Sequence, residues 1–438
     1  MAGFFNAIFW FVCYVVAILL PLRFAILIAP VEAGRSFLLE LGVGCGLIAY
    51  PLLTFEFLLV GRLRGISQLY GNDVLMFFHK YMGIAALLFV IGHAALVSRG
   101  DLTQLNPLGG SAMLRDGNWA LWLVVGIALT AVFRKALRLK YGLWMVLHSL
   151  LALGIAVFGL KHILAVHAYT ARPMLQGLMV GCFLAYLLPL LRYRVWEFFS
   201  MQRKPWKVVA NRDEGGRSRT LVLEPIGHAG FEFQPGQFAW LSTGRPFVSE
   251  QHPISLASSA EVASDRRIEF SIRDLGDWSG QTVPKVAPGA QIYVNGPFGG
   301  FSLDREPGQG FVLIAGGIGI TPMRSMLLTM RDRGDVRPVI LFYADRDSES
   351  LIHREELTRL TREMSLTLVL VLEAPPAGWT GEQGRIDAAL LRRHLPVQFK
   401  RYQYFMCGPA AMMDAVEEHL ATLRLPQVRV HAERFNIV

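Results

Sequence analysis

Four histidines lie at matched spacing in two long apolar segments of the sequence. His79 and His93 are fourteen positions apart, and so are His148 and His162. At about 3.6 residues per turn, fourteen residues make close to four whole helical turns, so both histidines of a pair face one side of a helix. They would be separated by about 21 Å along it. That distance covers much of the roughly 30 Å hydrocarbon core of a bilayer.

This spacing predicts four metal ligands. Ionisable side chains inside a membrane are costly and usually functional. A single histidine in such a segment is about as often a hydrogen-bonded packing residue, but four at one spacing in two helices are much harder to obtain by chance. Two helices of this kind suit two flat cofactors held one above the other. Haem with two axial imidazoles fits that arrangement.

A glycine turn near residue 316 carries a second kind of chemistry. The apolar run 311–315 reads as a buried strand, and a helical pattern follows the turn. Strand, glycine turn and helix form the first unit of a doubly wound sheet, in which the backbone approaches a pyrophosphate and the helix start attracts its charge. The predicted nucleotide-binding residues of this turn are Gly316, Gly317, Gly319, Thr321 and Pro322.

Residues 203–308 read as short strands separated by turns, the pattern of an all-β barrel. Arg273 follows one of these strands, and the turn Gly276-Asp277-Trp278-Ser279 comes directly after it. If Asp277 or Ser279 opens a short helix, its free N–H groups favour a diphosphate, and Arg273 adds a forked donor. Such a turn is also common as a simple capped helix.

Composition indicates that the histidine segments lie in a membrane. Of the 438 residues, 53% are hydrophobic and only 18% are charged, which is too apolar for an ordinary soluble protein. Residues 1–200 hold 15 Lys and Arg against 7 Asp and Glu, a net +8 of the total +9. With no basic face elsewhere, a nucleic-acid partner is not expected. The four cysteines have neither metal nor disulfide spacing.

Six apolar stretches must position the histidines. Basic residues gather in the connections after the second and fourth stretches and after the last, which places these connections and both termini in the cytoplasm. The third and fifth stretches then run in the same direction. His79 therefore pairs with His148 near the cytoplasmic side, and His93 pairs with His162 near the far side. The predicted spans are 5–28, 37–60, 74–97, 118–136, 142–166 and 173–194.

Together these motifs resemble the membrane branch of the ferredoxin–NADP reductase superfamily, the ferric reductases and NADPH oxidases, in its prokaryotic NADPH oxidase-like form. The resemblance covers almost the whole chain and implies three parts. Residues 1–200 would form a six-helix transmembrane bundle with two b-type haems. Residues 201–309 would form an antiparallel β-barrel that binds FAD, and residues 310–438 an α/β doubly wound domain that binds NAD(P)H. It also implies a cell inner membrane protein with cytoplasmic soluble domains.

The resemblance assigns flavin-binding residues. His252, Pro253, Ile254 and Ser255 stand where the family lines FAD, with Ile254 in the place of an aromatic residue. The family implies that Ser255 lies near the reactive nitrogen of the flavin. It also implies that Arg273 and the 276–279 turn hold the diphosphate.

The resemblance also assigns nicotinamide-site residues. The segments 296–299 (Gly-Pro-Phe-Gly) and Cys407-Gly408-Pro409 look like the signatures of that site, and Glu433-Arg434-Phe435 looks like the family's C-terminal Glu-x-Phe. In that motif the aromatic ring covers the flavin and moves away for nicotinamide. Three residues follow Phe435, where many relatives end at the aromatic. The expected catalytic residues are Ser255, Cys407 and Phe435.

The choice between NADPH and NADH depends on one strand end. Relatives often place a hydroxyl residue and an arginine there for the 2′-phosphate of NADPH. Arg346 is present and favours NADPH, while Ala344 replaces the hydroxyl and Asp345 would repel a phosphate if it pointed inward. NADPH is therefore the expected donor, with NADH possible.

The expected activity is that of an NAD(P)H oxidase or ferric reductase, with electrons passing from cytoplasmic NAD(P)H through FAD and two haems to the far side. Dioxygen, reduced to superoxide, is the first expected acceptor, and a ferric chelate is the alternative. A third reading is electron delivery to a periplasmic or membrane partner docked on loop 98–117. Some oxidases of the family have an extra outer histidine where this chain has Val97, which weakens the oxidase reading. Constitutive activity is expected.

Overall fold

The computed structural model describes residues 2–28, 36–60, 72–109, 111–166, 172–245, 250–261 and 266–434. The chain divides into two compact units. The first, helical unit ends at Trp196, and the second, sheet-containing unit begins at Glu197. The domain boundary predicted from the sequence, at residue 200, lies close to this division.

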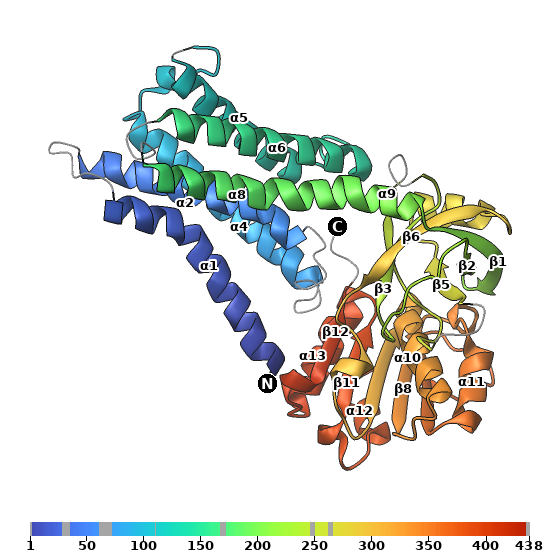
Figure 1. Ribbon diagram of the computed structural model, residues 1–438. Helices are drawn as coiled ribbons and strands as arrows, with labels where there is room; N and C mark the ends of the chain where they lie inside the picture. Colours follow the sequence, from blue (N-terminus) through green and yellow to red (C-terminus); the bar gives the residue numbers. More distant parts are fainter. Residues whose placement is uncertain are drawn as a thin grey trace. The chain divides into compact units, whose positions relative to one another are not determined.

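Long helices build the first unit (Figure 1). Helices α5 and α6 lie side by side, and α2 lies against both α1 and α8. The core of the unit is formed where α1, α2 and α8 meet, around Tyr50 and Met179. The long helices of the described residues are α1 (Ala2–Ile28), α2 (Phe37–Val60), α4 (Asn72–Val97), α5 (Ala112–Val132), α6 (Tyr141–Ala165) and α8 (Pro173–Leu191).

Five of these helices are long and apolar enough to cross a membrane; within the described ranges, α5 is the long helix that is not among them. Its first turns carry Arg115, Asp116 and Asn118, which lower its apolar character. The predicted span 118–136 was also displaced, because the helix begins after Ser111, whose hydroxyl accepts a hydrogen bond from the Leu114 N–H, and ends at Val132. The sixth span therefore stays a prediction.

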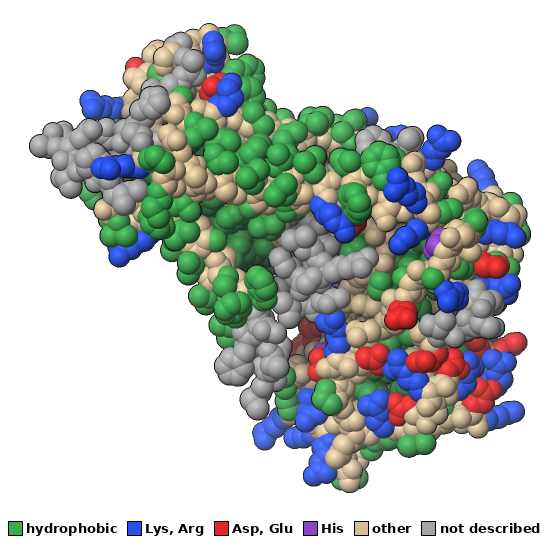
Figure 2. Space-filling model, viewed as in Figure 1, with side chains coloured by type: hydrophobic (Ala, Val, Ile, Leu, Met, Phe, Trp, Pro, Cys, Tyr) green, Lys and Arg blue, Asp and Glu red, His purple; other side chains and the backbone are tan. Residues whose placement is uncertain are grey.

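The exterior of the helical unit is apolar (Figure 2). Large side chains such as Phe77, Leu88 and Leu150 are exposed along its helices. An apolar surface of this extent is typical of contact with lipid rather than water. In the same view, Lys, Arg, Asp and Glu side chains gather on the sheet-containing unit.

An antiparallel sheet begins the second unit. Its six strands are hydrogen-bonded in the order β4-β3-β6-β1-β2-β5, and Trp206, Leu223 and Phe270 lie in the core beneath it. The antiparallel pairing agrees with the sequence expectation, whereas closure into a barrel stays a prediction. The strands are β1 (Pro205–Gly215), β2 (Ser218–Pro225), β3 (Phe238–Ser242), β4 (His252–Ser255), β5 (Ile268–Arg273) and β6 (Gln291–Phe298).

A parallel sheet of order β10-β9-β8-β7-β11-β12 completes the unit. Helices α10 and α11 cover one face and α12 and α13 the other, so the expected doubly wound arrangement is present. The strands are β7 (Phe311–Gly316), β8 (Val339–Asp345), β9 (Leu366–Leu372), β10 (Glu382–Gln383), β11 (Gln403–Cys407) and β12 (Val430–Glu433). The helices are α9 (Glu197–Gln202), α10 (Ile320–Asp332), α11 (Arg354–Glu363), α12 (Ala388–His394) and α13 (Ala410–Thr422).

Short helical turns complete the description. Near the predicted site residues these are η1 (Leu102–Leu105), η3 (Trp278–Thr282) and η6 (Gly317–Gly319). The others are η2 (Arg192–Trp196), η4 (Val283–Lys285), η5 (Leu303–Arg305), η7 (Ser348–Ser350), η8 (Phe399–Arg401) and η9 (Gln427–Arg429).

A buried arginine joins the two sheets of this unit. Arg324, on α10, is 5% exposed and donates to Glu269 on β5 at 2.7 Å and to the Ala257 carbonyl at 2.8 Å. It also donates to Glu356 on α11 at 2.5 and 3.1 Å. Removing it would leave two partly buried carboxylates without their shared cation.

We therefore expect Arg324→Ala to lower the free energy of unfolding of the sheet-containing unit by about 3–5 kcal/mol, the usual cost of breaking a buried ion pair. The measurement is denaturant unfolding of the detergent-solubilised chain, followed by tryptophan fluorescence. Arg331→Ala is the control, because Arg331 lies on the same helix, is more exposed and pairs with Asp332 and Glu363. Equal losses of unfolding free energy in the two variants would contradict the stabilising role of the Arg324 ion pairs.

Candidate functional site

The structure brings the four predicted histidines together in two pairs, as the topology required. The ring centres of His79 and His148 are 6.2 Å apart, and those of His93 and His162 are 6.0 Å apart. A metal–imidazole bond is about 2.0–2.1 Å long. Since the ring centre lies roughly 1.1 Å beyond the bonded nitrogen, two imidazoles on one metal have ring centres about 6 Å apart. Each pair is therefore spaced as axial ligands are.

Each pair could supply the two imidazole ligands of a haem. A metal ion held by protein side chains alone usually has three or four protein ligands. Among the described residues, no group of three or more His, Cys, Asp or Glu side chains is placed to hold an ion. Two imidazoles on opposite sides complete the coordination of a haem.

Contacts with α2 indicate which nitrogen each α4 histidine presents. His93 Nδ1 lies 2.9 Å from the Gly42 carbonyl, so it is the donor, and Nε2 remains for the opposite ring. His79 Nδ1 contacts the carboxylate of Glu56. A second partner of this kind fixes the tautomer and orientation of a metal-bound histidine.

Two glycines make room for the outer rings. A Cβ on Gly46 would lie 2.8 Å from His93 Nδ1, and a Cβ on Gly117 would lie 2.8 Å from His162 Nδ1. Any larger residue at either position would push the ring out of place. The inner pair has an aromatic neighbour instead, since the Trp144 ring centre is 5.1 Å from that of His148.

These supporting residues were missed from the sequence. Glu56 had no assignable partner there, and the glycines at 42, 44 and 46 were not singled out. A signal existed, because α2 enters from the side where α4 ends, so residues near 42–46 lie at the depth of His93. A glycine cluster at that depth indicates a close approach by a bulky neighbour.

A connecting segment is fixed to α5 near the outer pair. Asn118, adjacent to Gly117, donates to the carbonyls of Gln104 at 2.7 Å and Asn106 at 3.0 Å. Trp122 Nε1 donates to the Leu105 carbonyl at 3.0 Å. This cap (residues 101–106, containing η1) belongs to the loop proposed from the sequence as a docking surface.

Lys161, next to His162, has a specific partner. Its ammonium lies 3.1 Å from the carboxylate of Asp116, which is buried. The ion pair joins α6 to α5 beside the outer histidines and balances the two charges.

The predicted flavin-binding residues 252–255 form strand β4, paired with β3. His252 stacks on Trp278, with ring centres 4.0 Å apart and planes 17° from parallel. Burial lowers the pKa of His252, and its Nε2 has no hydrogen-bond partner among the described residues. Ser255 is only 4% exposed. A buried ring nitrogen without a partner fits a site completed by a bound group.

The predicted diphosphate turn is capped by its own serine. Helix η3 begins at Trp278, as expected, and Ser279 Oγ accepts from the N–H groups of Leu275 and Gly276 at 2.9 and 3.1 Å. Arg273 donates to Asp345 at 2.9 Å and to the Ser350 carbonyl at 3.3 Å, and its role in holding the diphosphate stays a prediction. It therefore joins the end of β5 to the end of β8.

The nicotinamide-site motifs converge at one end of the parallel sheet. The glycine turn η6 follows β7 and leads into α10, and a Cβ on Gly319 would lie 2.1 Å from the Cys407 carbonyl. Cys407 is paired with Ala315 on one side and Glu433 on the other. Ligands of doubly wound sheets bind at this carboxyl edge of the strands.

The remaining predicted residues of this edge have structural contacts as well. Thr321 donates its hydroxyl to the Ile318 carbonyl at 2.9 Å, and Pro322 is buried in α10. Gly408 lies against the Gly316 backbone, and Pro409 caps α13. Phe435 falls outside the described residues, so its expected position over the flavin stays a prediction.

Cys407 is suited to packing rather than to nucleophilic chemistry. Its side chain is 1% exposed, and burial raises the pKa of its thiol well above the ordinary range. A neutral thiol of this kind is a weak nucleophile. Its place at the nicotinamide site stays a prediction.

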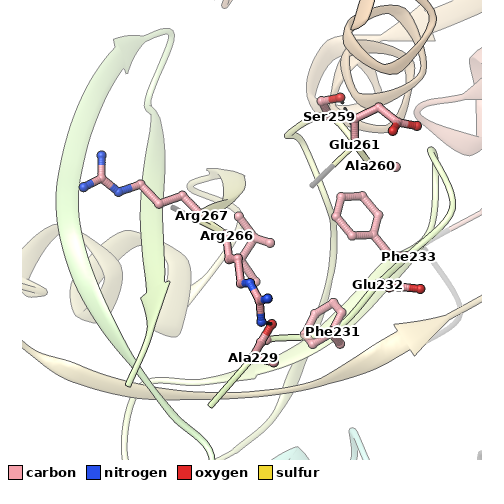
Figure 3. A pocket seen from close by; sticks show the side chains of 11 residues that line it. Ala229, Phe231, Glu232, Phe233, Ser259, Ala260, Glu261, Arg266 and Arg267 are labelled. Carbon is pink, nitrogen blue, oxygen red and sulfur yellow. Dashed lines mark hydrogen bonds between the residues drawn. The ribbon is translucent and has the colours of Figure 1, made fainter. Parts of the chain in front are cut away.

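A separate cavity of about 310 Å³ lies in the antiparallel part of the second unit (Figure 3). The rings of Phe231 and Phe233 border it, and Arg266 donates to the Ala229 carbonyl at 3.0 Å at its side. It contains none of the residues predicted to bind FAD or nicotinamide, so it lies outside the candidate site.

Comparison with known proteins matches two regions of the chain. Residues 45–159 match the family described as ferric reductase like transmembrane component, and residues 313–418 match the oxidoreductase NAD-binding domain. The ferric reductase match includes all but the last of the four histidines. The second match includes the glycine turn, Arg346 and Cys407.

Curated relatives are similar to the second half. The ferredoxin reductase component of 3-ketosteroid-9-alpha-monooxygenase from Rhodococcus rhodochrous is 35% identical over 212 residues, covering 47% of this chain and 57% of the relative. The flavohemoprotein of Deinococcus radiodurans is 30% identical over 241 residues, covering 53% and 59%. The chain thus spans less than two thirds of these relatives. A solved FAD/NAD-binding domain of Vibrio cholerae nitric oxide dioxygenase covers 53% of this chain and 98% of its own, at 23% identity and a TM-score of 0.47.

The chain therefore combines a region similar to ferric reductase transmembrane components with a region similar to the NAD-binding domains of oxidoreductases. Its ferric reductase-like transmembrane region and its reductase-type nucleotide domain together match a ferric reductase/NADPH oxidase-like family.

Proposed function

We propose that this protein moves electrons from cytoplasmic NAD(P)H across the membrane, through FAD and two b-type haems, to an acceptor on the far side. The observation that carries the proposal is the two imidazole pairs, spaced 6.2 and 6.0 Å between ring centres, at fourteen-residue intervals on both α4 and α6. When bound, FAD accepts a hydride and haem transfers single electrons, so the pair converts two-electron to one-electron chemistry.

The residues of the chain hold and orient these groups. The histidine pairs supply axial nitrogens at two depths, and Gly42 and Glu56 fix the α4 rings. In the second unit His252 offers its buried Nε2 to FAD, and the N-terminus of α10 receives the nicotinamide dinucleotide's phosphates. The positive-inside distribution of Lys and Arg supports a cytoplasmic position for this unit.

Replacing an outer ligand tests the proposal. We expect the purified, haem-replete chain to contain two low-spin haems, and His93→Leu to contain one, because a single remaining imidazole at that level cannot ligate both faces. Pyridine haemochrome content per chain and the visible α bands measure this. Ser149→Ala, beside His148, is the control: its hydroxyl donates to the Met145 carbonyl of its own helix. Two haems retained in His93→Leu would contradict the ligand assignment.

Dioxygen is the acceptor that the outer end of the helical unit favours. Asn118 and Trp122 hold the cap next to Gly117, which itself lies against the His162 ring. A cap held beside the outer pair would admit a small neutral molecule more readily than a bulky ferric chelate. The match to a ferric reductase-like component makes the chelate the second candidate.

Reoxidation of the reduced protein separates the two acceptors. After anaerobic reduction with NADPH, we expect added oxygen to reoxidise the protein faster than a ferric chelate does, with superoxide detected by dismutase-sensitive dye reduction. Asn118→Ala removes two hydrogen bonds to the cap. In this variant the rate of reoxidation by the chelate should rise relative to the rate of reoxidation by oxygen. A wild-type chain reoxidised faster by the chelate would identify a ferric reductase instead.

Arg346 supports NADPH as the donor. It is exposed at the end of β8, whereas Asp345 is turned toward Arg273 and also accepts from the Arg346 N–H at 2.8 Å. The carboxylate that would repel a 2′-phosphate is therefore already paired.

We expect Arg346→Ala to raise the KM for NADPH roughly tenfold, since a hydrogen bond to a charged group contributes about 1.5–3 kcal/mol. The KM for NADH should change less than twofold. Steady-state kinetics with both donors measure this. Arg385→Ala, an exposed arginine paired with Glu373, is the control. An equal rise in KM for both donors would show that Arg346 does not bind the 2′-phosphate.

A further inference from the structure

Helix α2 presents a partner to each histidine of α4. The Gly42 carbonyl accepts from His93 Nδ1, and the Glu56 carboxylate contacts His79 Nδ1. Gly42 and Glu56 are fourteen positions apart, as His79 and His93 are, and their order is reversed. Antiparallel helices with equal spacing bring both partners into register. At both levels, therefore, a residue of α2 contacts the Nδ1 atom of the α4 histidine. The two partners differ in one chemical property.

That difference is a charge. The outer histidine donates to a neutral carbonyl, whereas the inner one faces a carboxylate that is 8% exposed. A carboxylate partner makes a metal-bound imidazole more basic than a carbonyl does. A negative charge near the metal also favours its more positive, oxidised state, and the apolar surroundings strengthen the effect.

Other charges near the two levels do not reproduce this asymmetry. Beside the outer pair, Asp116 and Lys161 are paired at 3.1 Å and balance one another. At the inner level, Lys80 is exposed, and Arg134 lies over the Trp144 ring at 5.5 Å. Glu56 is therefore the charged group in direct contact with a predicted ligand among the described residues.

We propose that Glu56 is a positioning residue that keeps the reduction potential of the inner haem below that of the outer one, so that electrons run outward. This inference rests on the proposed function, because it needs haem at both levels. It assigns the direction of electron transfer between the two haem levels to a single buried carboxylate on α2.

The test is a potentiometric titration of the purified, haem-replete full chain, followed in the α bands. His93→Leu assigns the inner component, because that variant keeps only the inner ligand pair. In Glu56→Gln, which keeps an oxygen acceptor and removes the charge, we expect the ratio of reduced to oxidised inner haem at a fixed potential to rise about tenfold, which is about 59 mV for one electron. The outer component should not move.

Two further variants separate charge from packing. Glu56→Asp keeps the carboxylate and should leave the inner potential closer to wild type than Glu56→Gln does. Glu40→Gln removes the same charge from the same helix, about 24 Å away along it, and should leave the inner potential unchanged.

Each outcome decides the matter. An inner potential that does not move in Glu56→Gln, or a shift equal at both haems, overturns the role of Glu56 while leaving the haem assignment intact. If Glu56→Gln loses haem, the reduction potentials of the two haems in the wild-type chain are compared instead. An inner haem with the higher potential overturns the inference. A wild-type chain that binds no haem overturns the proposed function and this inference with it.

Discussion

The structure depends on the cost of placing imidazole rings in an apolar helical bundle. A polar ring there needs a partner for each nitrogen. For the α4 histidines, α2 provides one partner with a carbonyl at one depth and a carboxylate at the other. Each of these rings also lies about six ångströms, between ring centres, from a histidine ring of α6. Glycines on α2 and α5 provide the space. The helices are thus arranged around two sites that a coordinated metal would complete.

In the second unit, ion pairs hold the antiparallel and the parallel parts in a fixed relation. Arg324 bridges Glu269 and Glu356, and Arg273 reaches Asp345 at the end of β8. Both arginines join the antiparallel part to the parallel part. Burial raises the pKa of Asp345, an effect that the nearby Arg273 charge opposes. Such contacts align the carboxyl edge of the parallel sheet with the residues predicted to line FAD.

Residue spacing was enough to predict the pairs of histidines, since helical periodicity and the direction of the spans determine which rings meet. The strands and the parallel sheet followed from apolar runs and turn residues. Contacts made by distant segments were not predictable in this way. The contact of Glu56 with His79 and that of Arg273 with Asp345 were not foreseen, and α5 begins earlier than its apolar run because Ser111 caps a polar first turn. Each of these features depends on which helix or strand packs beside it. A single sequence does not specify those neighbours.

The central claim, that electrons cross the membrane through two imidazole pairs, is tested most directly in sealed vesicles. The purified chain is reconstituted with an impermeant oxidant, such as ferric cytochrome c, trapped inside, and NADPH is added outside. The account predicts that the trapped oxidant is reduced while the vesicles stay sealed. If only oxidant added to the NADPH side is reduced, electrons do not cross, and the proposed conduit is wrong.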